Sequence, residues 1–385
     1  MRVLLLYDCL FPYTVGGAER WYRNLAERLA ADGHEVTYLT LRQWGRDEQA
    51  QVEGVRVLSC GPRMGLYTEG GRRRTLPPLV YGLGVFLHLL RNGRSYEVVH
   101  TASFPYFSLL AAGVLRPLGR YRLVVDWHEV WSRAYWREYL GRLGGAVGYA
   151  VQLACARLPQ QAFCFSRLHA RRLQQEGLRG SVEVLEGEYA GSLEAPVPRT
   201  AELRVVFAGR MIAEKRAPAG VAAVAAAAGR IPGLRGTFYG DGPEREKVLA
   251  EIERLGAASY IDAPGFVASE EVDEALRSAT CMLLPSRREG YGMVVVEASA
   301  RATPSVVVAD EDNAATELIE EGVNGTVAAS AAPETMADAI VRVHEAGIEM
   351  RRSTATWFAE NAVRLSLEGS LQTVLETYGG ASARV

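Results

Sequence analysis

Short apolar runs of strand length recur along the chain, each followed by glycines or polar residues and then by a helix-like segment. The runs at residues 2–7, 203–210 and 281–284 are dominated by apolar side chains, which is typical of strands buried on both faces of a parallel sheet. Their alternation with helices favours an α/β fold with doubly wound sheets. Such sheets bind ligands beyond the carboxyl ends of their strands, so the loops there are the first places to look for function.

The chain is too long for a single core, because its 385 residues exceed the usual size of one domain. The β/α pattern restarts at residue 203, after a stretch stiffened by Pro196 and Pro198. We therefore predict an N-terminal domain over residues 1–195, a C-terminal domain over 196–360, and a closing helical segment over 361–385.

Composition places the chain among globular proteins, with 48% hydrophobic and 23% charged residues. It holds no stretch of about 20 apolar residues, and the apolar run at its N-terminus is short for a signal peptide, so we expect a cytoplasmic protein. The five cysteines are scattered and never spaced as CxxC. They are typical of small core residues and indicate neither a zinc site nor a disulfide framework.

Charge is unevenly distributed between the two halves. Residues 1–190 hold 24 arginines, no lysine and 17 acidic residues, a balance of +7, whereas the remainder holds 19 basic and 28 acidic residues, a balance of −9. A basic half suits an anionic acceptor or an anionic membrane surface, although the same charge also simply favours solubility. No basic stripe interleaved with aromatics is present, so nucleic acid is not an expected partner.

Two carboxylates stand out in the strand, loop and helix at residues 280–302. Glu289 lies in the polar loop, and Glu297 follows inside an apolar helix between Val296 and Ala298. A carboxylate among apolar residues is costly to bury unless hydrogen-bond donors reach it, and sugar hydroxyls are such donors. The simpler alternative for Glu297 alone is a surface position on an amphipathic helix.

Other loops after strands carry further candidates. Gly16 and Gly17 occupy the first strand-to-helix turn, where backbone N–H groups can approach a phosphate, although glycines also serve ordinary turns. His128 follows the strand at 121–127, a position that suits substrate contact, although a lone histidine is more often structural. Arg210 and Lys215 are the cations of the loop that follows the first strand of the second half.

Glu289 and Glu297 resemble the Glu-x7-Glu pattern of family 4 retaining glycosyltransferases. Arg210 and Lys215 precede them in the order that this family shows. That resemblance covers the whole chain and implies the GT-B fold: an α/β protein with two Rossmann-like domains, a cleft between them and a C-terminal helix that crosses back. It also implies roles for the matching residues. Arg210 and Lys215 would bind the donor diphosphate, Glu289 the donor sugar and Glu297 the ribose.

The same resemblance extends the donor site to backbone positions. It implies that Gly16 and Gly17 contact donor phosphates and the acceptor, and that His128 contacts the donor sugar, with Asp126 or Glu129 fixing its tautomer. Its remaining donor-binding positions are Gly240, Val267, Gly290, Tyr291 and Gly292. Gly240 and Val267 belong to segments that border the nucleobase in the family.

Some positions depart from the family pattern. Arg216 stands where the family usually has glycine, which puts the local turn geometry in doubt, and Ala302 replaces another frequent glycine. Asn313 and Ala314 occupy the place of a common glycine pair and are expected to tune donor choice. Asp310 and Asp312 form a DxD, but with cations available for the diphosphate we expect no metal there.

The resulting prediction is a metal-independent, retaining hexosyltransferase that needs no cofactor besides its nucleotide-sugar co-substrate. The donor would be a UDP- or GDP-type sugar, and the acceptor a hydroxyl of a lipid, a polysaccharide or a small natural product. The alternatives are a GT-B sugar-nucleotide epimerase and a non-catalytic sugar-nucleotide-binding subunit. A phosphorylase is disfavoured because Lys247, in an acidic helix, is a poor pyridoxal phosphate site, and a glycosidase because it needs no diphosphate site.

Two segments of the basic half are candidates for peripheral contact with the inner face of a membrane. Residues 64–78 form a basic loop with three consecutive arginines, and residues 131–157 begin rich in Trp, Tyr and Arg. Aromatics beside arginines are typical of interfacial membrane helices, of carbohydrate-stacking surfaces and of ordinary packing, so the sequence leaves these three open. An anionic or amphiphilic acceptor would suit the same half.

Overall fold

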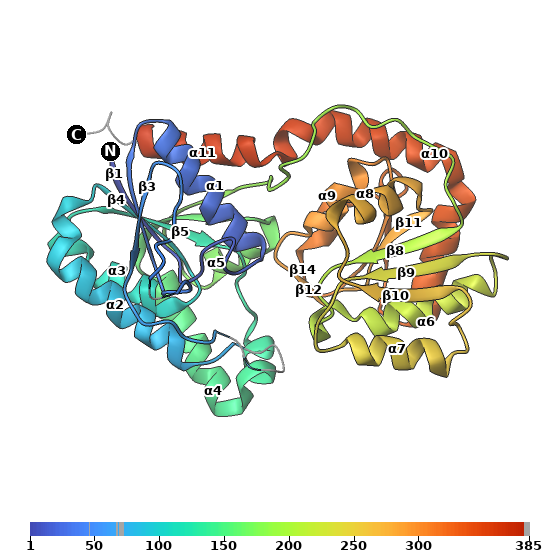
Figure 1. Ribbon diagram of the computed structural model, residues 1–385, viewed down its shortest axis with the longest axis horizontal. Helices are drawn as coiled ribbons and strands as arrows, with labels where there is room; N and C mark the ends of the chain where they lie inside the picture. Colours follow the sequence, from blue (N-terminus) through green and yellow to red (C-terminus); the bar gives the residue numbers. More distant parts are fainter. Residues whose placement is uncertain (46, 67, 69–72, 381–385) are drawn as a thin grey trace. The chain divides into compact units, whose positions relative to one another are not determined.

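The computed structural model describes residues 1–45, 47–66, 68 and 73–380. These residues form two compact α/β units, each built on its own parallel sheet (Figure 1). The first unit holds the chain up to Leu185 and again from Ser370 onward, and the second holds Glu186–Gly369. The predicted pair of doubly wound domains is confirmed.

The first unit contains a seven-stranded sheet in the order β3-β2-β1-β4-β5-β6-β7. All of its neighbouring strands are parallel. Its strands are β1 (Arg2–Leu6), β2 (Glu35–Thr40), β3 (Val55–Ser59), β4 (Val98–Ala102), β5 (Arg122–Trp127), β6 (Pro159–Cys164) and β7 (Arg179–Val184). In β1 every position after Arg2 is buried, as its continuous apolar run predicted for a strand covered on both faces.

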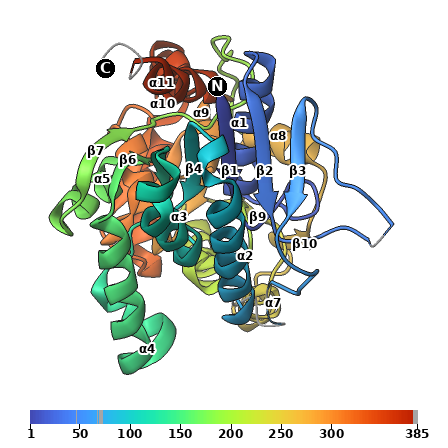
Figure 2. The same cartoon turned by 90° about the vertical axis from the view of Figure 1, so that its left-hand side faces the viewer.

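Helices connect these strands, and α2 and α3 run side by side along the unit (Figures 1 and 2). The helices of the unit are α1 (Gly17–Ala31), α2 (Leu76–Asn92), η1 (Gly93–Ser95), α3 (Tyr106–Gly119), α4 (Arg133–Ala156), α5 (Arg167–Gln175) and α11 (Leu367–Gly380). Ser132 and Ser166 cap α4 and α5 through their side chains.

The second unit contains a six-stranded parallel sheet in the order β10-β9-β8-β11-β13-β15, and a separate pair, β12-β14. Its strands are β8 (Arg204–Ala208), β9 (Arg235–Tyr239), β10 (Ile261–Gly265), β11 (Cys281–Leu284), β12 (Arg288–Glu289), β13 (Ser305–Val308), β14 (Asp312–Asn313) and β15 (Gly325–Ala328). Its helices are η2 (Ala213–Lys215), α6 (Ala217–Ala228), α7 (Arg245–Arg254), α8 (Ser269–Ser278), α9 (Met293–Ser299), η3 (Ala314–Leu318) and α10 (Pro333–Leu365). One apolar core joins the sheet to α6 and α10.

The chain leaves the first unit earlier than the composition of the linker suggests. After β7, Tyr189 exchanges backbone hydrogen bonds with Leu365 and Leu367, and Arg364 forms an ion pair with Glu186. These contacts attach the stretch after Leu185 to the end of α10. The boundary between the two compact units therefore falls before the proline-containing segment around residue 196.

The two helices that close the chain, α10 and α11, are interrupted at two points. Gly347 has a non-helical conformation within α10, and Ser366 is extended between α10 and α11. Helix α11 then packs on the first unit: Arg122 on β5 donates to the carbonyl of Tyr378 at 2.7 Å, and His100 on β4 contacts the Tyr378 hydroxyl at 2.6 Å. The C-terminal helix therefore returns to the first unit, as predicted.

The aromatic residues at the start of α4 are packing residues. Trp131 contacts Trp136 and Tyr135 with ring centroids 4.7 and 4.8 Å apart, and both partners are buried. Of the three uses that the sequence left open for this segment, the geometry favours ordinary packing. In the basic loop at 64–78, residues 67 and 69–72 lie outside the described part of the chain.

A buried carboxylate near α4 makes the stability of this unit depend on pH. Glu176 accepts hydrogen bonds from the side-chain amide of Gln152 at 2.9 Å, and burial raises its pKa from 4.5 to about 7. The carboxyl loses its proton near pH 4.5 in the unfolded chain and near pH 7 in the folded protein. The stability that protonated Glu176 contributes is therefore fully present below pH 4.5 and is lost as pH rises to about 7.

We expect Glu176→Gln to flatten the fall in urea midpoint between pH 4.5 and 7 and to stabilise the protein at pH 8. The exposed Glu183→Gln variant is the control, and parallel profiles for Glu176→Gln and wild type would contradict the assignment.

Candidate active site

Each sheet has one point where the direction of strand addition reverses. In the first unit β1 lies between β2 and β4, and in the second β8 lies between β9 and β11. The loops beyond the carboxyl ends of these strands are where doubly wound sheets bind ligands. All of the predicted site residues follow the carboxyl ends of strands. Most of them lie beside these two points, whereas His128 follows β5 and Val267 follows β10.

In the second unit, the structure brings Lys215 and Glu289 together. Lys215 ends η2 after β8, Glu289 lies in the loop after β11, and their side chains form an ion pair with Nζ and Oε1 2.5 Å apart. Glu289 is only 8% exposed, so it needs a partner of opposite charge. Lysine has three N–H donors, and one bond to Glu289 leaves the others available to an anionic ligand.

A short strand pair holds the Glu289 loop in place. Glu289 in β12 pairs with Asn313 in β14, and the buried Asn313 amide donates to Ser286 and Val308 at 3.0 and 2.8 Å. Asn313 thereby fastens the loops after β11 and β13 to each other. The sequence identified Asn313 only as a departure from a glycine, and its fastening role depends on contacts between loops that are distant in the chain.

Two further departures from glycine, Arg216 and Ala302, occupy left-handed backbone conformations. Arg216 has a φ of 49° and Ala302 a φ of 56°, a region that favours glycine and costs other residues about 1–2 kcal/mol. Arg216 keeps the turn after Lys215 despite its side chain, and its guanidinium pairs with Asp310 at 3.0 Å. The turn geometry that the sequence put in doubt is therefore retained, and one DxD carboxylate is used by this ion pair.

The end of the Glu289 loop requires glycine. Gly292 has a φ of 107°, and a Cβ there would lie 2.5 Å from the Cβ of Ala315. The neighbouring Tyr291 is buried and donates its hydroxyl to the carbonyl of Glu186 at 2.7 Å, so its side chain fixes the loop instead of facing a ligand. Gly290 is half-buried in the same loop. Glu297 follows on the seven-residue helix α9 and is half-buried between the buried Val296 and Ala298.

The remaining donor-site candidates of this unit surround the end of β8. Arg210 is exposed directly after the strand. Gly240 after β9 approaches the β8 loop so closely that a Cβ would overlap the carbonyl of Gly209, and its N–H donates to Gly265 at 2.8 Å. Val267 is half-buried just beyond β10. Gly209, Gly240 and Gly265 therefore meet through backbone atoms.

In the first unit, Gly16 and Gly17 form the start of α1. Gly16 is the extended N-cap residue, and Gly17 is the first helical residue, with open space where a side chain would lie. The buried carboxylate of Glu19 packs against Gly16 and occupies the space beside it. A ligand phosphate at this helix start would therefore lie close to a negative charge, which the sequence did not anticipate.

His128 lies directly after β5 with its ring stacked on Phe165 at a centroid distance of 4.4 Å. Its Nε2 is shielded from solvent and has no hydrogen-bond partner among the described residues. Burial lowers the pKa of His128, although the nearby Asp126 and Glu129 oppose that shift. The imidazole is therefore neutral near pH 7, and its Nε2 has unused hydrogen-bonding capacity.

Asp126 does not fix the tautomer of His128 by a hydrogen bond, contrary to the sequence expectation. It accepts instead from the Trp21 indole at 2.7 Å and from His100 Nε2 at 2.8 Å. Burial alone would raise the pKa of Asp126, but His100, followed by His128 and Trp21, lowers it below its ordinary value. Glu129 accepts from the Trp131 indole at 2.7 Å, and neither carboxylate is hydrogen-bonded to His128 in the described part of the chain.

A further ion pair, which the sequence did not identify as a site, lies at the end of β1. The fully buried Asp8 pairs with Arg73, whose guanidinium also lies over the Phe104 ring, 5.1 Å from its centroid. Asp8 Oδ1 is buried with no partner among the described residues. The clue in the sequence was the position of Asp8 directly after the first strand, whereas its pairing with a distant arginine required the fold.

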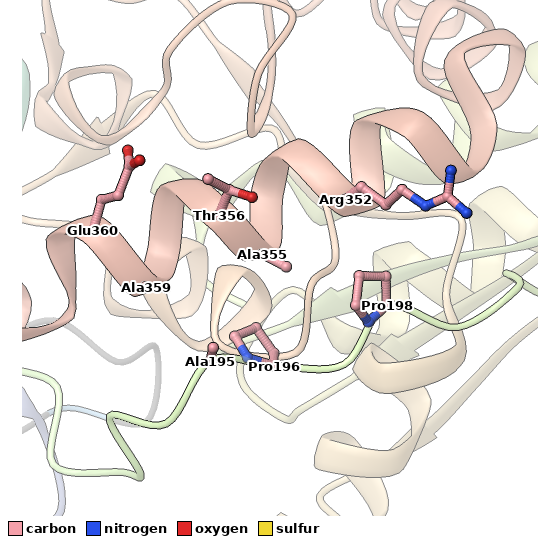
Figure 3. A pocket seen from close by; sticks show the side chains of 8 residues that line it. All are labelled: Ala195, Pro196, Pro198, Arg352, Ala355, Thr356, Ala359 and Glu360. Atoms are coloured by element: carbon pink, nitrogen blue, oxygen red, sulfur yellow. The ribbon is translucent and has the colours of Figure 1, made fainter.

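Three observations bear on other kinds of site. A groove between the linker and α10 contains none of the predicted site residues (Figure 3); it is lined by Ala195, Pro196, Pro198, Arg352, Ala355, Thr356, Ala359 and Glu360. Across the described ranges, no three His, Cys, Asp or Glu residues are grouped to hold a metal ion. Within the same ranges, no helix has the length and apolarity needed to cross a membrane.

Comparison with known proteins identifies both halves of the chain. Residues 15–186 match the family model described as Glycosyltransferase Family 4, and residues 202–346 match the model described as Glycosyl transferases group 1. A glycogen synthase of Mycobacterium tuberculosis is 24% identical, covering 88% of this chain and 84% of that protein. A D-inositol 3-phosphate glycosyltransferase of Corynebacterium urealyticum is 26% identical, covering 94% and 90%.

Solved structures show the same fold over the whole length. A sucrose-phosphate synthase from Thermosynechococcus elongatus superposes with a TM-score of 0.77 at 16% identity, covering 100% of both chains. Anabaena HepE in complex with UDP superposes with a TM-score of 0.71 at 18% identity, covering 99% of this chain and 100% of that one. Together with the two parallel-sheet units and the returning C-terminal helix, these matches show that the chain belongs to the family 4 glycosyltransferases of the GT-B fold.

Proposed function

We propose that the protein is a retaining glycosyltransferase that moves a sugar from a UDP- or GDP-type nucleotide-diphosphate sugar to an acceptor hydroxyl, without a metal ion. The observation that carries this proposal is the part-buried Lys215–Glu289 pair beside the end of β8. It combines a cation for a departing diphosphate with a carboxylate that can accept hydrogen bonds from sugar hydroxyls. HepE, a structural neighbour, has been solved with UDP, which supports a donor of this type.

Each candidate residue then has a chemical role. Lys215 and the exposed Arg210 hold the diphosphate and stabilise the negative charge that grows as the nucleotide departs. Glu289 and the neutral His128 orient the donor sugar, and Glu297 accepts from the ribose hydroxyls. In the reaction, the bond from the anomeric carbon to the phosphate oxygen breaks as the acceptor oxygen bonds to the same face of that carbon. The acceptor proton passes to the leaving phosphate.

The acceptor class follows from the first unit, which we propose meets an anionic or amphiphilic hydroxyl compound at the inner face of a membrane. Its excess of arginine supports that assignment. An epimerase or a non-catalytic binding subunit is not favoured, because the comparisons that cover most of the chain are with transferases and synthases.

Nucleotide binding tests the proposal directly. A thermal-shift titration with UDP, GDP, ADP and dTDP should raise Tm by several degrees for one of them, because a ligand at 100 times its Kd stabilises the native state by about 2.7 kcal/mol. The shift should persist with EDTA and disappear in Lys215→Met. If no diphosphate shifts Tm, the proposed donor site is wrong, and a shift that requires a divalent ion would exclude the metal-free mechanism.

A further inference from the structure

Helix α2 presents a stripe of leucines to solvent. The exposed leucines recur every three or four residues, which places them within an arc of about 80° on a helix that turns about 100° per residue. A surface helix ordinarily carries polar side chains on that side. The stripe consists of Leu76, Leu79, Leu83, Leu87 and Leu90, which are 39–61% exposed.

Helix α3 extends this apolar surface. It runs beside α2 in both views of the fold (Figures 1 and 2), and the contact is so close that a Cβ at Gly82 would overlap the Phe107 side chain. Phe107, Val114 and Leu118 on α3 are 37–62% exposed. We call the five leucines of the α2 stripe, together with these three residues, the leucine face. Apolar surface gathered in this way marks an interaction site more often than scattered exposed residues do.

The charges in this part of the chain are almost all positive. Between Arg73 and Val125 there are seven arginines and one acidic residue, Glu97. Glu97 accepts a hydrogen bond from the backbone N–H of Arg2 at 2.8 Å and lies next to the Arg2 guanidinium. Arg94 donates to the carbonyl of Leu118 at 3.3 Å, so a cation lies directly at the end of the leucine face.

The other arginines lie on the same elements. Arg91 is in the last turn of α2, Arg116 is in the last turn of α3, and Arg120 is the residue after α3. Within the described ranges, no carboxylate forms an ion pair with Arg91, Arg94, Arg116 or Arg120. Arg116 is two residues from both Val114 and Leu118, so it lies on the opposite side of α3, and it donates to the carbonyl of Pro159 on β6 at 3.2 Å. The uncompensated cations beside the leucine face are therefore Arg91 and Arg94 at the end of α2.

From this combination we infer that the leucine face docks on an anionic lipid bilayer. The leucines would enter the boundary between headgroups and acyl chains, and the arginines would contact headgroup phosphates. This inference deepens the membrane contact proposed above and assigns it to α2 and α3 instead of the aromatic start of α4, whose rings pack against one another.

Charge and side-chain type disfavour the other occupants. In a two-fold dimer through this face, each arginine-rich surface would meet its own copy without acidic residues to neutralise it, which is repulsive. Interfaces between proteins usually contain aromatic anchors and directed hydrogen bonds at their centre. The leucine face has seven aliphatic residues and one Phe, and a fluid bilayer needs no complementary shape to receive them.

Flotation of the full-length protein with lipid vesicles tests the inference. We expect binding to vesicles that contain phosphatidylglycerol, weak binding to pure phosphatidylcholine, and loss of binding at high salt. The triple variant Leu79→Gln/Leu83→Gln/Leu87→Gln should bind at least about tenfold more weakly, because three apolar side chains no longer enter the bilayer. Arg91→Gln/Arg94→Gln should weaken binding to the anionic vesicles only.

A matched control separates this face from general surface hydrophobicity. Val197→Gln/Ile348→Gln/Val363→Gln replaces three exposed aliphatic residues of the second unit and should bind as wild type does. The inference is overturned if wild type fails to float at low salt or if both triple variants bind equally. It is also overturned if sedimentation shows a dimer that the leucine variant alone dissociates. Every variant should keep its nucleotide thermal shift, so a failure of membrane binding and a failure of the proposed donor site give different results.

Discussion

Lys215→Met is expected to lower kcat by about 10²–10³-fold, the usual loss when one preorganised group that stabilises transition-state charge is removed. Lys215 is 20% exposed at its side chain and lies against Glu289, so the substitution also leaves a nearly buried carboxylate without its partner. We therefore expect a stability loss of about 1–3 kcal/mol beside the loss of activity. Steady-state transfer assays and urea denaturation would measure the two effects separately.

The controls decide whether Lys215 acts on the substrate or only on the fold. The chain has one other lysine, Lys247, which is exposed and paired with Glu244, so Lys247→Met should leave both kcat and stability unchanged. The double variant Lys215→Met/Glu289→Gln removes the unpaired charge and should recover most of the lost stability. If it also recovered activity, the role of Lys215 would be structural and the diphosphate assignment would be wrong.

Asp126→Ala is expected to produce the largest loss of stability, about 3–5 kcal/mol, because it removes the carboxylate from a fully buried hydrogen-bond network. The carboxylate accepts from Trp21 and His100, and His100 in turn contacts Tyr378 on α11. Removing it leaves two donors, one on α1 and one on β4, without acceptors in the core. The urea midpoint at neutral pH would report the loss.

Two more conservative variants should each cost less stability than Asp126→Ala. Asp126→Asn can still accept from Trp21 and can donate to His100 if the imidazole tautomer reverses, so it should cost clearly less than alanine. Tyr378→Phe removes only the hydroxyl and should cost about 1–3 kcal/mol. Equal losses for Asn and Ala, or a loss below about 1 kcal/mol for Ala, would contradict the network as described.

The lowered pKa of Asp126 also predicts how the stability of the protein depends on pH. Because the folded-state pKa of Asp126 is lowered, its contribution is present above the ordinary value of 3.8 and is lost as pH falls below it. Wild type should therefore lose stability between neutral pH and pH 3 more steeply than Asp126→Asn. This direction is opposite to that expected for Glu176, whose pKa is raised by burial.

Local patterns in the sequence were sufficient for the elements and their order. The continuous apolar run before Asp8 predicts a buried strand, and β1 ends at Leu6, just short of it. Lys215 and Glu289 were each recognisable from the strand, loop and helix around them, because a ligand site at a strand end depends on nearby residues. Their assignment to one site nevertheless came from the family resemblance, since they are 74 positions apart.

Tertiary structure alone decided how those elements are fastened and which faces they expose. The pairing of His100 with Tyr378 spans 278 positions, and no spacing rule links two residues so distant. Arg216 and Ala302 look like mismatches to a glycine pattern, and only their backbone angles show that the glycine conformation persists. Helix α2 is apolar on nearly all sides, so its sequence predicts burial without saying which side is buried. Packing against α3 and the sheet settles that choice, because only one side of a helix that covers a sheet can face the core, and it leaves the leucine stripe facing solvent.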